Sequence, residues 1–192
     1  MAAPANITIK NLSGKWQMNK TLSDSPEPAL ALQGIGWMVR KAVGLATLTL
    51  HVKQYEGAPK PPSTATDPVT HIDIDQTTTE NRCLDLEFRE HADWLFGSCR
   101  GQSDWRSPAE IEDEFLKKGW LEGDAESTGP QGKSHVYSHV ENVDNGWTAT
   151  QIWGFQEIDG QRRYARNIVV AKDDKKVEFR LVYDYLGEND AA

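Results

Sequence analysis

The chain has 192 residues, of which 38% are hydrophobic and seven are tryptophan, and its formal net charge is −8. This length suits one domain around a single hydrophobic core, and the aromatic content argues against a disordered chain. Nucleic acids and anionic membrane surfaces repel an acidic protein, so neither is expected as a partner.

Two further features bear on the compartment and on metal chemistry. Residues 1–12 lack a basic segment followed by an apolar one, and no run approaches the roughly 18 apolar residues of a membrane span. We therefore expect a cytoplasmic protein without a signal peptide or membrane insertion. Cys83 and Cys99 are too few for a disulfide framework and belong to no cluster with zinc spacing, so free thiols, no metal and no cofactor are expected.

The first third of the chain contains an unusual helical segment followed by a strand. Residues 33–43, QGIGWMVRKAV, mix helix-forming residues with two glycines and a basic pair, although glycine in a helix interior costs about 1 kcal/mol relative to alanine. Residues 45–55 alternate, with Leu50 and Val52 on one face, which predicts a strand. Residues 56–68 contain four prolines and are predicted to be a loop, because proline cannot donate to a central strand.

Alternation dominates the next part of the chain. Residues 69–90 and 93–105 are predicted as strands, since apolar and polar residues follow each other with a period of two. Gly97 and Gly101 interrupt the second run, and glycines of this kind are typical of bends where a sheet curls into a barrel.

One capped helix is predicted over residues 107–119. Ser107 is a natural N-cap, Pro108 suits the first helical position, and Glu110 completes a capping box. Residues 122–133, which follow it, have the composition of a flexible surface loop.

The remaining strands are separated by short turns with Asp, Asn and Gly, which are typical of hairpins. These strands are predicted at 134–143, 146–158, 162–172 and 176–186, and residues 187–192 are expected to be a disordered tail. Successive strands joined by short turns favour an antiparallel meander, and closure removes its exposed edges. We predict a single mainly β domain: a closed or nearly closed up-and-down barrel of about eight strands.

The order of motifs in the first part of the chain resembles the start of the intracellular fatty-acid-binding and retinoid-binding proteins, which are calycins. That family begins with a strand carrying Gly-x-Trp, here Gly14-Lys15-Trp16, and continues through a polar stretch ending in Ser23-Asp24. Two short helices follow, whose junction holds Gly34-x-Gly36 and then Arg40-Lys41. The resemblance implies a ligand-binding barrel with a helical lid after its first strand.

This resemblance assigns roles to the lid residues. Gly34 and Gly36 would form the turn between the helices, because glycine adopts backbone conformations closed to other residues. Met38 would belong to an apolar stripe facing the cavity and, with Trp37, would guard the ligand portal. Arg40 and its neighbour Lys41 would mark the solvent side.

The last predicted strand departs from the family in a way that affects the ligand. Many fatty-acid binders hold a carboxylate with an Arg and a Tyr two residues apart; Tyr183 matches the Tyr, but Leu181 occupies the position of the Arg. A carboxylate-bound fatty acid is therefore not expected. The chain also resembles a group of small lipocalin-like proteins of filamentous fungi, and some proteins of this kind are cofactor-free cyclases of polyketide or terpenoid pathways.

Strand alternation selects the candidate site residues, because polar residues in phase with aromatic ones can face a barrel interior. An inward Arg166 would anchor an anion or enolate, Tyr183 is in phase with Phe179, and His139 could act as an acid, base or hydrogen-bond donor. A solvated polar face opposite a valine core is the alternative for His139 and Tyr137. The catalytic candidates are Tyr183, His139 and Arg166, and the ligand-binding candidates are Trp37, Met38, Tyr137, Gln151, Trp153, Tyr164 and Tyr185.

Two functions fit these residues. The first is a cofactor-independent cyclase or isomerase of secondary metabolism, which binds a small hydrophobic or aromatic metabolite and holds its reacting groups in place, an effect worth about 7–11 kcal/mol. The second is a non-catalytic carrier or storage protein for a lipid-like ligand. A haem barrel would need a proximal histidine, and a homodimer is left open.

Overall fold

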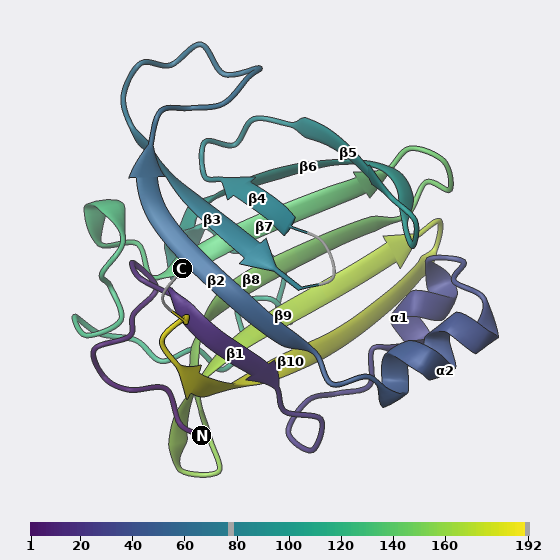
Figure 1. Ribbon diagram of the computed structural model, residues 1–192, viewed down its shortest axis with the longest axis horizontal. Helices are drawn as coiled ribbons and strands as arrows, with labels where there is room; N and C mark the ends of the chain where they lie inside the picture. Colours follow the sequence, from purple (N-terminus) through teal and green to yellow (C-terminus); the bar gives the residue numbers. More distant parts are fainter. Residues whose placement is uncertain (77–78, 191–192) are drawn as a thin grey trace.

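The structure is a computed structural model that describes residues 1–76 and 79–190. Its strands form one antiparallel sheet in the order β4-β3-β2-β1-β10-β9-β8-β7-β6-β5 (Figure 1). The elements are β1 (Gly14–Met18), α1 (Glu27–Leu32), α2 (Trp37–Leu45), β2 (Thr49–Gly57), β3 (Val69–Asp75), β4 (Thr79–Cys83), β5 (Arg89–Asp93), β6 (Gly97–Arg106), β7 (His135–Asn142), β8 (Thr148–Ile158), β9 (Gln161–Lys172) and β10 (Lys175–Gly187).

The sheet is mainly β and strongly curled, as predicted, but it has ten strands and is a half-barrel (Figure 1). The count exceeds about eight because each of the two alternating runs in residues 69–106 contributes a hairpin. The edge strands β4 and β5 are not hydrogen-bonded neighbours, and a single bridge between Leu84 and Ser103 joins the two sides. The prediction of a closed or nearly closed barrel of about eight strands is therefore only partly correct.

The two predicted short helices are present and lie at one end of the half-barrel beside β9 and β10 (Figure 1). Gly34 has φ +87°, a left-handed conformation that favours glycine, and it forms the turn between the helices. Ala29 and Leu30 of α1 are buried, whereas α2 contributes no buried residue. The pair is attached to the barrel through α1.

The prediction of a helix over residues 107–119 is wrong. The capping box forms, with both the backbone N–H and the hydroxyl of Ser107 donating to the Glu110 carboxylate at 2.7 and 2.8 Å. It caps only one turn of 3-10 helix, Pro108–Glu110, after which the chain is irregular. The local signal was therefore correct for the first turn alone.

One local side chain and one side chain of β9 explain why the helix stops after its first turn. Asp113 accepts the backbone N–H groups of Phe115 and Leu116 at 2.9 and 3.0 Å, a local arrangement that competes with helix formation. Asn167 of β9 donates to three backbone carbonyls that a helix would use, those of Phe115, Leu116 and Lys118. The segment lies instead across the outer face of the sheet, where Ile111 and Leu116 pack against Ile152 and Val169.

The inner face of the sheet carries the main hydrophobic core. Trp16 is completely buried there, and its indole N–H donates to the carbonyl of Leu12 at 2.8 Å. Ile7 and Ile9 of the N-terminal segment belong to the same cluster, so residues that precede β1 fill one end of the half-barrel. Packed side chains therefore occupy this end of the inner face.

Residues 122–133 contain a short 3-10 turn, and an ion pair of Glu126 anchors them to the sheet. The Glu126 carboxylate accepts two hydrogen bonds from the Arg162 guanidinium, at 2.7 and 2.8 Å. This pair joins the segment to the start of β9.

At the end of the chain, Asp190 pairs with Lys15 of β1 at 2.8 Å. Asn189 donates to the backbone carbonyl of Val52 at the same distance. Of the tail expected over residues 187–192, residues 191–192 lie outside the described part of the chain.

Candidate functional site

Arg166 is the central polar residue of the inner face. The strand register places it on β9 between Trp153 of β8 and Leu181 of β10. Its guanidinium carbon lies 4.0 Å from the centroid of the Trp153 ring, and the residue is only 9% exposed. Arg166 thus points to the inner face of β9, as the alternation of this strand predicted.

The guanidinium of Arg166 is incompletely satisfied. Its Nε donates to the Tyr164 hydroxyl at 2.9 Å, whereas the buried Nη2 has no hydrogen-bond partner in the part of the chain that the structure describes. Arginine keeps its proton in proteins, and a buried charge without a partner is costly. The inner core therefore contains a positive charge with one unused hydrogen-bond donor, Nη2.

Two tyrosines surround this charge. Tyr183 on β10 is 1% exposed, its ring centroid lies 5.2 Å from that of Tyr164, and the Arg166 guanidinium is 5.2 Å from its ring. Burial raises the pKa of Tyr183, and burial raises the pKa of Tyr164 to about 12 although Arg166 opposes the shift. Both phenols are therefore neutral near neutral pH and can donate hydrogen bonds.

Gln151 and Trp153 form the β8 wall of the site. The Trp153 indole N–H donates to the Gln151 amide oxygen at 3.0 Å. Gln151 faces Ser138 of β7 and Ile168 of β9 in the register, and it remains partly accessible on the inner face. Leu181 beside Arg166 is also partly accessible, so this level of the inner face is not fully packed.

Tyr185, another predicted ligand-binding residue, packs toward β1. Its ring lies 4.9 Å from that of Trp16 in an edge arrangement. A Cβ atom at Gly14 would lie 2.6 Å from the Tyr185 ring, so this glycine leaves room for the tyrosine. The contact fixes Tyr185 as part of the packed end of the core.

His139 and Tyr137 lie on the outer face of β7, so the prediction that they point inward is wrong. Val136, a strand neighbour of Tyr137, belongs to the inner core, whereas Tyr137 packs against the outer cluster and beneath the Arg106 guanidinium at 4.7 Å. His139 Nδ1 is 2.8 Å from the Thr150 hydroxyl. Side chains along β7 alternate between two faces, and the face that carries Val136 is the inner one.

Trp37 and Met38 also lie away from the inner face. Their exposed fractions are 65% and 68%, because α2 packs against α1 and not against the strands. Arg40, expected on the solvent side, instead donates to Glu27 of α1 at 2.7 Å and holds the helix pair together. The expected apolar stripe over the cavity thus stops short of Met38.

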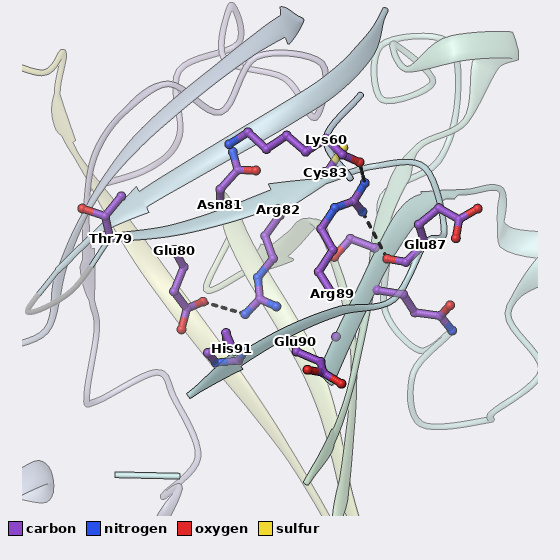
Figure 2. Close-up of a pocket in the computed structure, with 13 residues that line it drawn as sticks. Lys60, Thr79, Glu80, Asn81, Arg82, Cys83, Glu87, Arg89, Glu90 and His91 are labelled. Carbon is purple, nitrogen blue, oxygen red and sulfur yellow. Dashed lines mark hydrogen bonds and ion pairs between the residues drawn. The ribbon is translucent and has the colours of Figure 1, made fainter. Parts of the chain in front are cut away.

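A polar pocket of about 260 Å³ lies between β4, β5 and β6, and Figure 2 shows its charged lining. Figure 2 shows Arg82 paired with Glu80 at 2.6 Å and Arg89 donating to the carbonyl of Lys60 at 2.6 Å. Arg89 also pairs with Asp85 at 2.6 Å. The sequence predicted no site residue in this pocket, because the register that places Arg82 opposite the buried Ile72 is set by the pairing of β3 with β4. Arg82 and Arg89 each have a carboxylate partner, whereas the buried Nε of Arg82 has no hydrogen-bond partner among the described residues.

Among residues 1–76 and 79–190, no group of three or more candidate ligands could hold a metal ion. No helix in the same ranges is long and apolar enough to cross a membrane.

Comparison with known proteins gives the family. The chain is 33% identical over 199 residues to the probable pericyclase scpY of Mollisia scopiformis, a match that covers 99% of this chain and 97% of the relative. It belongs to this family of fungal pericyclases. The pericyclase pydY of an Acremonium species is also 33% identical, over 97% of this chain and 98% of its own length. No protein-family model matches the sequence.

The fold of this pericyclase-family chain is also that of a fatty-acid-binding protein. It aligns with the fatty-acid-binding protein of Schistosoma mansoni in complex with arachidonic acid, at a TM-score of 0.55 and 12% identity. The alignment covers 91% of this chain and 96% of that one. The predicted calycin resemblance is thereby confirmed at the level of the fold.

Proposed function

We propose that the protein binds a small hydrophobic or aromatic metabolite on the inner face of the half-barrel and accelerates a pericyclic ring closure of it, without a cofactor. The observation that carries this proposal is the buried guanidinium of Arg166, which lies 5.2 Å from the Tyr183 ring and whose Nη2 has no hydrogen-bond partner among the described residues. Full-length similarity to two pericyclases supports the reaction class.

A pericyclic reaction moves electrons around a ring of atoms in one step, and no atom is gained or lost. The protein therefore needs no nucleophile and no redox partner; it needs to hold the reacting ends together and to polarise one of them. Fixing two reacting groups in a productive geometry is worth about 7–11 kcal/mol in favourable cases. The aromatic walls formed by Trp153 and Tyr164 suit a planar conjugated chain.

Arg166 Nη2 and the neutral Tyr183 hydroxyl would supply the polarisation. A donor on a carbonyl conjugated to the reacting π-bond withdraws electron density from that bond, and this effect is strongest in a buried site. Positive charge held before the reaction begins costs no reorganisation during it. Both residues thus act on a carbonyl of the substrate.

The test uses the source organism and the purified protein. Deletion of the gene is expected to leave an uncyclised precursor in the metabolite extract, and the wild-type protein is expected to convert it. Arg166→Met should lower the rate by about 100-fold and Tyr183→Phe by about tenfold. His139→Ala, on the outer face, is the matched control and should keep the rate. If the purified protein binds the precursor from this extract but does not convert it, catalysis is refuted and the protein is a carrier.

A further inference from the structure

Trp153 connects two separate hydrogen-bond donors of the inner face. The Arg166 guanidinium packs over the face of its indole ring, and the indole N–H donates to Gln151. One side chain on β8 thus fixes a residue of β9 and a neighbour two positions away on its own strand.

The indole contact determines which way the Gln151 amide points. An indole N–H can only donate, so the amide atom that faces it must be the oxygen. The Gln151 NH₂ group must then point away from Trp153, and within residues 1–76 and 79–190 it donates no hydrogen bond. The orientation follows from donor and acceptor chemistry alone.

The Ser138 hydroxyl lies opposite Gln151 and is a further polar group without a hydrogen-bond partner among the described residues. Ser138 pairs with Gln151 across the β7–β8 ladder; its hydroxyl is completely buried and has no partner among the described residues. Together with Arg166 Nη2, three neighbouring strands present polar groups whose hydrogen bonds are unmade. Buried polar groups are normally paired, so a ligand with more than one acceptor is the natural complement.

We propose that Gln151 is a second substrate-binding donor and that Trp153 is the positioning residue that keeps its NH₂ group turned toward the substrate. The site then selects a substrate with two acceptor oxygens, one for Arg166 and one for Gln151. Arginine offers donors only and the Gln151 oxygen is occupied by Trp153, so a hydroxyl or amine donor on the ligand would find no acceptor on either residue. This inference rests on the proposed function only in taking the inner face as the substrate site.

The experiment measures equilibrium binding with two probes that differ by one acetyl group. Decyl-substituted acetylacetone has two acceptor oxygens and methyl undecyl ketone has one, and calorimetric titration gives both dissociation constants. Wild-type protein should bind the diketone about tenfold more tightly. Gln151→Leu should reduce this preference to below about twofold, and Trp153→Phe, which keeps the ring and removes the N–H, should reduce it substantially.

The double variant separates positioning from packing. If Trp153 acts through Gln151, Trp153→Phe should change the preference no further in the Gln151→Leu background. Gln17→Leu, on the outer face of β1, is the matched control and should bind both probes as the wild type does. Gln151→Glu, which keeps the side-chain shape, replaces Gln151→Leu if the latter does not fold by circular dichroism.

Equal wild-type affinity for the two probes, or a preference that survives loss of the Gln151 NH₂ group, would overturn the inference. An additive effect in the double variant would overturn the role of Trp153. These binding results do not depend on turnover. A preference without conversion of the precursor would refute the pericyclase proposal alone, and conversion without a preference would refute the role of Gln151 alone.

Discussion

His135 is buried in a way that should make the protein sensitive to acid. It lies on the outer face of β7, 1% exposed, with its ring centroid 5.0 Å from that of Trp120. Neither ring nitrogen makes a well-formed hydrogen bond within the described residues. Burial lowers the pKa of His135 from 6.5 to about 4, although the nearby Glu126 carboxylate opposes the shift.

The sign and size of the effect follow from linkage. A histidine whose folded pKa is lower than its unfolded pKa binds protons more readily in the unfolded chain, so acid favours unfolding. Its stabilising contribution is complete above about pH 6.5 and is lost as the pH falls toward about 4. Between about pH 7.5 and about pH 4.5, the shift corresponds to about 2–3 kcal/mol of unfolding free energy.

Urea unfolding followed by tryptophan fluorescence at these two pH values measures this contribution. His135→Leu removes the titrating ring, so its stability should fall by about 2–3 kcal/mol less than that of the wild type on acidification. His91→Asn, on the edge strand β5, is the control and should keep the wild-type loss. If His135→Leu loses as much stability as the wild type, burial of this ring is not the source of the acid sensitivity.

Three further predictions test the packing described above. Gly154→Ala should destabilise the protein by about 1–3 kcal/mol, because its Cβ would lie 2.7 Å from the His135 ring; an unchanged urea midpoint would contradict the packing. Asn167→Ala should cost about 2 kcal/mol and increase proteolysis within residues 107–121, since it removes the hydrogen bonds that hold the carbonyls of Phe115 and Lys118 to β9; cleavage elsewhere would argue against this role. Trp37→Ser should change stability by less than about 0.5 kcal/mol, because the side chain is exposed; a larger loss on thermal melting would show that α2 is packed in solution.

The sequence predicted the local features that depend on neighbouring residues. The glycine at position 34 that breaks the two helices, and the one-turn capping box at Ser107, both appear where expected. The inward orientation of Arg166 and Tyr183 was also predicted from the sequence. Arg166 shares a strand face with Ile168, Tyr183 shares one with Phe179, and both apolar side chains are buried.

The phase of β7 was not readable, for a physical reason. Residues 107–121 cover the outer face of this strand, so His135 is as buried as Val136 beside it. When both faces of a strand are buried, alternation no longer distinguishes inside from outside. His139 was therefore placed on the wrong side.

The sequence by itself thus determined the alternating strands, the helix pair and the inward residues of the last two strands, because these depend on contacts within a few positions. The tertiary structure decided the rest. It ended the predicted helix through Asn167, which lies about fifty residues away in the chain. It left β4 and β5 as unpaired edges, and it brought Trp153, Arg166 and Gln151 together through a register that no local pattern contains.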